Sequence, residues 1–399
     1  MKQVFSILAL YAVLDAAPLE PAREAVAGRW ITTSEITHAM LENIQPRLAF
    51  RSGVTAEEFA AWQADVRAAV KRLFVRPEYL ASDRAPCLLT VERRDDCRIE
   101  KWEAYPVRHA AVRFLVLIPP HREGVRLPAV LCIPGSGQTK EQLASPGGMA
   151  DFYACQGYIA VAVDHPGIGE TADPAVSEEY LARQLLEMGW SWLGYSVALD
   201  QAVLDWMKTR ADVRADRIII SGFSLGTEPL MVLGNLNPDV YAFVYNDFLC
   251  RTLERACVLT KPGKDGRRPK INSIRHLVPG FWREFDFPDL VAALAPRPVL
   301  FTEGGMDRDF SLVRAAFSCI HAADHVEIHH YAAFQNPASR ELLEHMPERI
   351  DRDEFFRKAN VEPSRHGFKR DLVRPWLKKW TDTHESDGNT LPGYSLTNG

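Results

Sequence analysis

The 399-residue sequence lacks the short motifs that mark many metal and nucleotide sites. It has no H-E-x-x-H, no G-x-x-x-x-G-K-[ST] and no G-x-G-x-x-G, which disfavours a zinc protease, a P-loop ATPase and a dinucleotide-binding enzyme. It also has no C-x-x-C pair, and its seven cysteines form an odd, scattered set: Cys87, Cys97, Cys132, Cys155, Cys250, Cys257 and Cys319. A disulfide scaffold and a structural zinc site are therefore disfavoured, and we expect neither a metal nor a cofactor.

The sequence also lacks an excess of basic charge and a long apolar run. Lys and Arg number 47 against 52 Asp and Glu, so the formal net charge is -5 and nothing indicates a nucleic-acid partner. No apolar run approaches the roughly 20 residues that a membrane-spanning helix needs. We therefore expect no stable membrane span.

The N-terminus carries a short apolar run at residues 4–14, preceded by Lys2. It resembles the hydrophobic region of a signal peptide, but no A-x-A pair follows, and Asp15 stands where small neutral residues are expected. We expect a packed N-terminal helix and, given the scattered cysteines, a cytoplasmic protein. Export by an atypical N-terminal signal is the alternative.

What the sequence does contain is an alternation of apolar runs and helical patterns. Hydrophobic residues make up 47% of the chain, enough for a large core. Helical patterns such as 148–156 and 196–208 separate several of the runs. Strands alternating with helices predict an α/β fold with a mostly parallel sheet and helices on both faces. The expected strands are residues 97–105, 112–118, 129–133, 158–163, 218–220, 241–245, 297–302 and 326–331.

Several segments extend or interrupt this alternation. Residues 1–85 are predicted to be a helical N-terminal extension, whose clearest helix begins with the capping-box pattern Thr55-Ala-Glu-Glu58. The α/β domain is expected over residues 86–385. Within it, 251–290 is a candidate lid and 335–360 a charged, helical insertion. The polar tail at 386–399 is expected to be disordered.

The most informative stretch is residues 217–234. An apolar run leads into Gly222-Phe223-Ser224-Leu225-Gly226, and an apolar segment follows. This G-x-S-x-G pattern, with a strand before it and a helix after it, predicts a sharp turn that lifts Ser224 above a sheet. The outer glycines fit because the turn leaves no room for a Cβ atom. Amide N–H groups at the start of the following helix would favour an oxyanion beside the serine.

Further motifs occur in the order that is typical of the α/β-hydrolase family. They are the P-G-S-G loop at 134–137, the turn around Ser224, an acidic loop after a later strand, and His366-Gly367-Phe368. Over roughly residues 95–380 the chain resembles this family. The D-H-P-G-I-G-E segment at 164–170 and the His366 motif are similar to the dienelactone-hydrolase and acetyl-xylan-esterase-like branch. The resemblance implies an α/β-hydrolase fold and makes residues 86–385 the catalytic domain.

The resemblance implies the chain order nucleophile, acid and histidine, with Ser224 as nucleophile. The acid is expected on the loop after the seventh core strand, where a Gly-Gly turn exposes Asp307. We take Asp307 as the acid. Glu303 and Asp309 on the same loop are alternatives, as is Asp247 after the preceding strand, where some family members place the acid.

The base that a serine hydroxyl needs is expected after the last strand. His366 lies beyond the 335–360 insertion, has a glycine beside it that permits a tight loop, and matches the family's histidine loop. His329 and His330 lie on the last expected strand, where a histidine is more often a sheet residue than a base. We therefore take His366 as the base.

The family also implies an oxyanion hole made of two backbone N–H groups. One belongs to the residue after the nucleophile, here Leu225, and the other to the loop after the third strand. Ser136, Gly137 and Gln138 are the candidates for the second donor, and the sequence does not distinguish them.

Aromatic residues near these motifs are candidates for substrate binding. Trp190 and Trp192 precede the helix before the Ser224 turn, whereas Phe281 and Trp282 lie in the candidate lid; core packing is the alternative for each. The lid also carries a basic segment at 261–270 that could bind an anionic substrate, with a solvated surface loop as the alternative.

Together these features predict a serine carboxylic-ester hydrolase that forms an acyl-enzyme and acts on a small-molecule or glycan ester. A peptidase, a thioesterase or an acyltransferase with the same nucleophile are alternatives. A non-catalytic binding protein with the hydrolase fold is another, since fold does not fix function.

Overall fold

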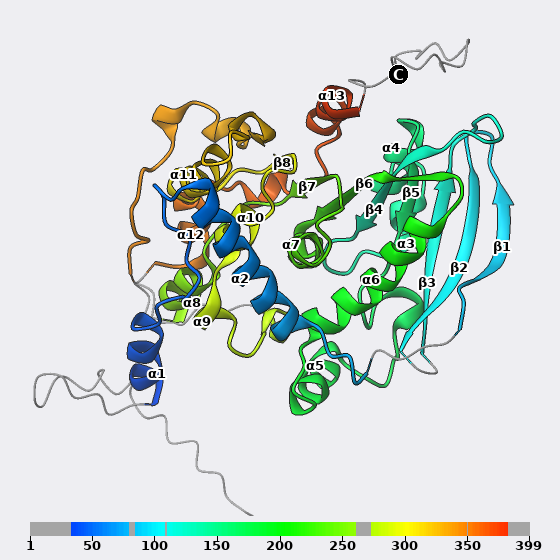
Figure 1. Cartoon of the computed structure of the whole chain (residues 1–399). Coiled ribbons are helices and arrows are strands. Elements are labelled where there is room, and N and C mark those ends of the chain that lie inside the picture. Colours follow the sequence, from blue (N-terminus) through cyan, green and yellow to red (C-terminus); the bar gives the residue numbers. More distant parts are fainter. Residues whose placement is uncertain (1–32, 80–83, 108–109, 261–272, 349, 382–399) are drawn as a thin grey trace, which may run out of the picture. The chain divides into compact units, whose positions relative to one another are not determined.

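The computed structural model describes residues 33–79, 84–107, 110–260, 273–348 and 350–381 (Figure 1). The N-terminal apolar run, the basic segment at 261–270 and the tail at 386–399 lie outside these residues. The chain divides into two compact units, Met1–Ile44 and Gln45–Gly399. Helix α1 (Thr33–Glu42) belongs to the first unit, and all elements discussed below belong to the second.

A nine-stranded sheet forms the centre of the second unit within the described residues, in the order β1-β2-β3-β5-β4-β6-β7-β8-β9. β1, β2, β3 and β5 pair antiparallel in turn, and every pair from β5/β4 to β8/β9 is parallel. The mostly parallel sheet is therefore confirmed. The strands are β1 (Cys87–Arg93), β2 (Arg98–Val107), β3 (Ala110–Ile118), β4 (Leu127–Ile133), β5 (Ile159–Ala162), β6 (Val213–Phe223), β7 (Ala242–Asn246), β8 (Val299–Phe301) and β9 (Val326–Ile328).

The central strands are buried on both faces, which is why their sequences read as continuous apolar runs. All residues of β5, β7 and β8 are buried. Each of the eight expected strands is present, but β1 was not predicted as a separate strand. It lies at the sheet edge with six of its seven residues exposed, so it lacks the alternation that marks a half-buried strand.

Helices cover both faces of the sheet and create two apolar cores. One core contains buried residues of α2, α5, α6, α7, α10 and α11; the other contains those of α3, α4 and α13. The helix bounds are α2 (Ala56–Phe74), α3 (Lys140–Ala144), α4 (Met149–Cys155), α5 (Glu178–Glu187), α6 (Trp192–Thr209), α7 (Thr227–Leu236), α8 (Thr252–Thr260), α9 (Phe281–Glu284), α10 (Phe287–Ala292), α11 (Asp307–Ser318), α12 (Arg352–Lys358) and α13 (Arg370–Thr381). No described helix is both long and apolar enough to cross a membrane.

Helix α2, placed by the sequence in the N-terminal extension, is part of the larger unit. It begins with the expected capping box: the Thr55 side chain accepts from the Glu58 N–H, and the Glu58 carboxylate accepts from the Thr55 N–H. Its buried face, which includes Phe59, Val66 and Phe74, belongs to the main core. This apolar face therefore docks the helix against the sheet domain.

A third, smaller core joins the candidate lid to the 335–360 segment. Val258 and Leu259 of α8 share it with Phe355 and Phe356 of α12. The prediction that 335–360 is a helical insertion is only partly right. α12 and a short 3-10 turn (Pro337–Ser339) are its helical parts among the described residues, because prolines at 337 and 347 remove N–H donors from the segment.

We expect Thr55→Ala to lower the free energy of unfolding by about 1 kcal/mol, because the N–H of Glu58 loses its cap. Denaturant unfolding of the two proteins measures the difference. Thr55→Ser keeps the hydroxyl and is the control. If both variants lose the same stability, the cap contributes nothing and the loss comes from the missing methyl group.

Candidate active site

Ser224 lies in the turn between β6 and α7, at a backbone angle few side chains adopt. Its φ is 51°, in the left-handed region. The turn is so tight that a Cβ on Gly222 would lie 2.4 Å from the carbonyl oxygen of Gly226, and a Cβ on Gly226 would lie 2.4 Å from that of Ile133. Both glycines are thus required sterically. The strained turn holds Ser224 at the carboxyl end of the central strand β6, as the G-x-S-x-G pattern predicts.

His366 follows a short 3-10 turn (Pro363–Arg365), and its ring stacks on Phe223 with 4.7 Å between centroids. Its Nδ1 lies 2.5 Å from Oε2 of Glu303, two residues after the end of β8. Glu303 is fully buried and accepts two further hydrogen bonds, from the Gly367 N–H at 2.9 Å and from Lys369 Nζ at 2.7 Å. Three donors on one buried carboxylate fix both the carboxylate and the imidazole.

The structure does not bring Asp307 to His366, which corrects the choice of acid made from the sequence. Asp307 is the first residue of α11, and its carboxylate lies 3.0 Å from Arg340 Nε and 3.8 Å from His330 Nε2. It lines a separate cavity. The Gly-Gly turn between Glu303 and Asp307 directs the former toward His366 and the latter to the start of a helix.

The other acids and histidines considered from the sequence lie elsewhere, with one exception. Asp309 is buried against Arg251, 2.7 Å away, and His329 lies 2.8 Å from Glu327. Asp247 is the exception: its Oδ1 lies 4.0 Å from His366 Nδ1. Burial, partly offset by the charge of His366, raises the pKa of Asp247 to about 7.

The two carboxylates also determine the basicity of His366. Burial disfavours the charged imidazolium, but the hydrogen bond that His366 donates to Glu303 and the charges of Asp247 and Glu303 outweigh it, so the pKa of His366 is raised. For Glu303, burial raises the pKa, but the hydrogen bond and charge of His366 and the hydrogen bond of Lys369 outweigh it and leave the pKa lowered. Glu303 is therefore ionised at neutral pH, and Nδ1 of His366 carries the shared proton.

Of the four residues proposed for the oxyanion hole, Ser136 and Leu225 line the same cavity as Ser224 and His366. The N–H of Ser136 has no hydrogen-bond acceptor within the described chain. Gly137 makes the turn with φ 77°, whereas the N–H of Gln138 donates to the Gly135 carbonyl at 3.2 Å. Ser136 and Leu225 are thus better placed than Gly137 and Gln138.

The loop that carries Ser136 is held by the D-H-P-G-I-G-E segment. Nε2 of His165 lies 2.7 Å from the Pro134 carbonyl oxygen, and Asp164 accepts from both the N–H and Nζ of Lys140, each at 2.6 Å. His165 is buried, which lowers its pKa to about 4, so it is neutral and donates this hydrogen bond. Its role here is to position the loop.

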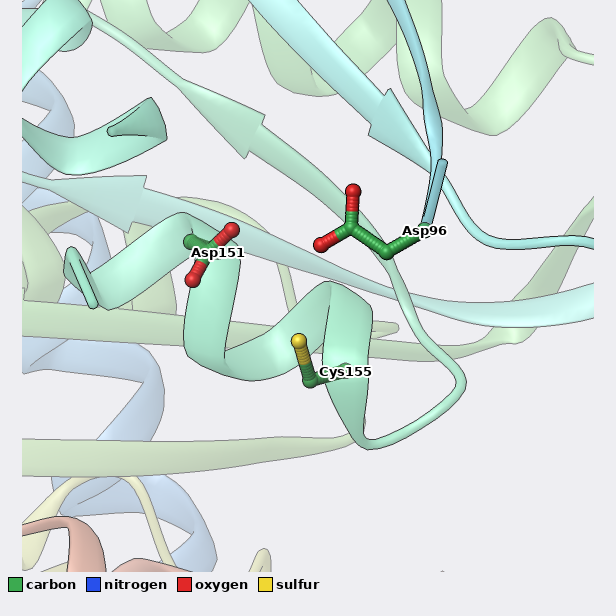
Figure 2. Close-up of side chains that lie close together, drawn as sticks. All are labelled: Asp96, Asp151 and Cys155. Atoms are coloured by element: carbon green, nitrogen blue, oxygen red, sulfur yellow. The ribbon is translucent and has the colours of Figure 1, made fainter. Parts of the chain in front are cut away.

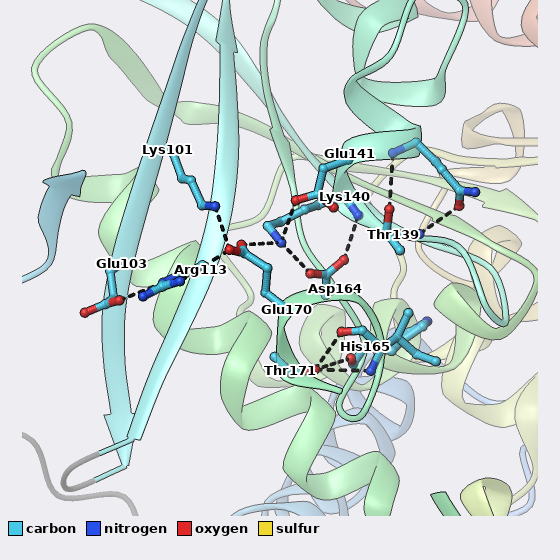
Figure 3. Close-up of polar contacts among 12 residues, drawn as sticks. Lys101, Glu103, Arg113, Thr139, Lys140, Glu141, Asp164, His165, Glu170 and Thr171 are labelled. Carbon is cyan, nitrogen blue, oxygen red and sulfur yellow. Dashed lines mark hydrogen bonds and ion pairs between the residues drawn. The ribbon is translucent and has the colours of Figure 1, made fainter. Parts of the chain in front are cut away.

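Lys140 is the centre of a buried charge network (Figure 3). Its ammonium is fully buried and contacts Asp164, Glu170 and Glu141 at 2.6, 2.7 and 2.9 Å. Glu170 reaches further to Lys101 on β2, 2.6 Å away. A buried lysine with three carboxylates keeps its charge, and the pKa of Lys140 is raised because these contacts outweigh the cost of burial.

The cavity that contains Ser224 and His366 has a volume of about 340 Å³. None of the four aromatic residues proposed for substrate binding is among its lining residues. Trp190, Trp192 and Phe281 belong to the main core, and Trp282 donates to Thr252 Oγ1 at 3.0 Å. The candidate lid does contribute to the wall, but through Thr252, Arg255, Arg275, His276 and Phe287.

Two groups of side chains have the spacing of metal ligands within the described residues. Asp247, Glu303 and His366 are already joined around the imidazole. The second group is Asp96, Asp151 and Cys155, the last two one turn apart on α4 (Figure 2). The guanidinium of Arg94 lies 3.2 Å from Asp151 and 3.8 Å from Asp96. A cation already bridges these carboxylates, so neither group indicates a metal site.

Comparison with known proteins agrees with this fold. A sequence model of the Abhydrolase family matches residues 21–379. The chain belongs to this family. A curated relative, "Putative hydrolase YtaP" from Bacillus subtilis (strain 168), is 29% identical over 159 residues, which are 40% of this chain and 50% of that protein. The chain thus spans about half the length of the curated relative.

Two solved structures extend the comparison of this Abhydrolase family member. A "putative acetyl xylan esterase" from Bacteroides fragilis NCTC 9343 is 48% identical, covers 88% of this chain and 96% of its own, and has a TM-score of 0.84. "Methylesterase BT1017" is 16% identical, covers 88% of this chain and 68% of its own, and shares the fold with a TM-score of 0.57. The resemblance to the α/β-hydrolase family is confirmed.

We expect NMR titration of His366 to give a pKa above 6.5, the ordinary value for histidine, and Glu303→Gln to lower it. The substitution removes the negative charge that stabilises the imidazolium. Asp307→Asn is the matched control, because Asp307 does not contact His366, and it should leave the pKa unchanged. Equal shifts in both variants would contradict the pairing of Glu303 with His366.

Proposed function

We propose that the protein is a serine carboxylic-ester hydrolase in which Ser224, His366 and Glu303 form the catalytic triad. The observation that carries the proposal is the contact between His366 Nδ1 and the buried Glu303, on the wall of the cavity that contains Ser224. A proton held on Nδ1 leaves the lone pair of Nε2 for the serine hydroxyl. This is the tautomer that a general base requires.

The reaction follows from these positions. Nε2 of His366 takes the proton of Ser224 as its Oγ attacks the ester carbonyl carbon, and a tetrahedral oxyanion forms. The N–H groups of Leu225 and Ser136 donate to this oxyanion. The imidazolium then gives its proton to the departing alcohol, which leaves an acyl-enzyme. Water, deprotonated by His366, attacks the acyl-enzyme and releases the carboxylic acid and the serine.

The substrate we propose is a short-chain ester of a carbohydrate or a small molecule. The relative from Bacteroides fragilis, 48% identical over nearly its whole length, is described as a "putative acetyl xylan esterase". A cavity of about 340 Å³ with hydroxyl, carboxylate and guanidinium groups on its wall suits a sugar-sized polar ligand. We therefore expect acetyl esters of glycans to be better substrates than long-chain acyl esters.

Ser224→Ala should lower kcat on p-nitrophenyl acetate by about 10⁶-fold, because no other group supplies the nucleophile. The native enzyme should release p-nitrophenol in a burst that is equal to the enzyme concentration, and a fluorophosphonate should label Ser224. Stopped-flow absorbance and peptide mass spectrometry measure these outcomes. Full activity of Ser224→Ala would rule out the mechanism.

A pair of isosteric substitutions tests the acid. Glu303→Gln should lower kcat by about 10⁴-fold, since an amide holds the imidazole in the wrong tautomer and cannot stabilise the imidazolium. Asp307→Asn should keep close to the native rate. The acid limb of kcat/KM for the native enzyme should lie above pH 6.5, because the pKa of His366 is raised and only the neutral imidazole acts as base. A large loss in Asp307→Asn with little change in Glu303→Gln would reverse the assignment.

A further inference from the structure

The cavity of Ser224 and His366 is also lined by two arginines from separate helices, Arg255 of α8 and Arg352 of α12. Both guanidinium groups lie over the ring of Phe356, with Cζ at 5.7 Å and 5.2 Å from its centroid. The ring therefore brings two positive charges together on one wall of the cavity. Figure 1 shows both helices on the same side of the molecule, and the third apolar core joins them.

Neither arginine forms an ion pair within the described part of the chain, although the charge of Arg255 acts on the carboxyl group of Asp247. This is unusual for their surroundings, because nearby arginines are paired: Arg251 lies 2.7 Å from Asp309, and Arg308 contacts Glu254. Nε of Arg255 is buried and has no hydrogen-bond acceptor. A buried donor without an acceptor costs free energy unless a ligand supplies the acceptor.

The acidic and other cationic groups of the cavity are already engaged. Glu228 lies 2.6 Å from Nδ1 of His276, and Asp247 faces His366. Arg275, the third arginine of the wall, binds Glu178 at 3.1 Å and the Ser136 hydroxyl at 2.7 Å. Among the described lining residues, Arg255 and Arg352 are therefore the only cationic groups without an ion-pair or hydrogen-bond partner.

We infer that Arg255 and Arg352 bind a carboxylate on the substrate, so that the enzyme prefers esters of acidic sugars such as uronic acid residues. This inference rests on the proposed esterase function and adds the substrate class. A guanidinium presents a planar fork of N–H donors that matches a carboxylate, and an aromatic ring beneath it orients the fork. The carboxylate is part of the substrate because both arginines share one cavity with the nucleophile.

The test compares two acetylated sugars that differ in one group, methyl glucuronoside and methyl glucoside, each carrying acetyl esters. The native enzyme should show a kcat/KM about 10- to 100-fold higher on the charged sugar, the effect of hydrogen bonds to a charged group. The preference should fall as salt is added, because the ions screen the attraction. It should disappear in Arg255→Gln/Arg352→Gln, because kcat/KM should fall far more on the charged sugar than on the neutral one.

The matched control is Arg217→Gln. Arg217 also lies over an aromatic ring, that of Tyr241 at 4.3 Å, but it does not line the cavity. This variant should keep the preference. No preference in the native enzyme would overturn the inference. An equal loss of kcat/KM on both sugars in the double variant would also overturn it. Such a result would show that the arginines act on the structure or on Asp247 instead.

Binding to catalytically inactive Ser224→Ala separates this inference from the esterase proposal. Calorimetry should detect methyl glucuronoside binding more tightly than methyl glucoside, and the double arginine substitution in the same background should remove the difference. If the sugar esters are not hydrolysed but this difference is found, the anion site stands and the proposed reaction fails. If hydrolysis occurs without any difference in binding, the reaction stands and the anion site fails.

Discussion

The contact between His366 and the buried carboxylate of Glu303 is the constraint around which the site is built. A carboxylate with no exposure to water is tolerated only because three donors surround it: the imidazole, the Gly367 N–H and Lys369. All three donors come from the segment between the last strand and α13. The end of β8 and this distant segment are therefore held together. The stacking of His366 on Phe223 places both beside the turn that carries Ser224.

The opposite wall of the cavity depends on a second buried charge. The loop with Ser136 has no regular structure of its own, but Lys140 at its end is fully buried against Asp164 and Glu170, and neutral His165 holds the Pro134 carbonyl. Because removing one member of such a network leaves another buried charge unpaired, the loop is held rigidly. Backbone donors fixed before the substrate binds are what stabilisation of an oxyanion requires.

The parts of the chain that depart from a minimal hydrolase fold give the cavity its chemistry. The segment from α8 to α10 and the 335–360 region meet in the third apolar core, and together they place Arg255, Arg352 and Phe356 on the wall. The sheet and the two larger cores hold Ser224, Glu303 and His366 in place. In the proposed esterase, selectivity between substrates is thus carried by segments that can change without disturbing the strands that position Ser224.

The sequence by itself determined eight of the nine described strands, the tight turn around Ser224 and the loop of His366, because apolar periodicity and glycine-dependent turns are local properties. It placed Trp190 and Trp192 at the site, whereas packing buried them in the core. Only the tertiary structure decided between Glu303 and Asp307, since both flank one turn and the choice depends on which carboxylate meets a histidine that lies far along the chain. The sequence could not identify Arg255 and Arg352 as a pair on the cavity wall either, because whether a charge is unpaired depends on its neighbours in space.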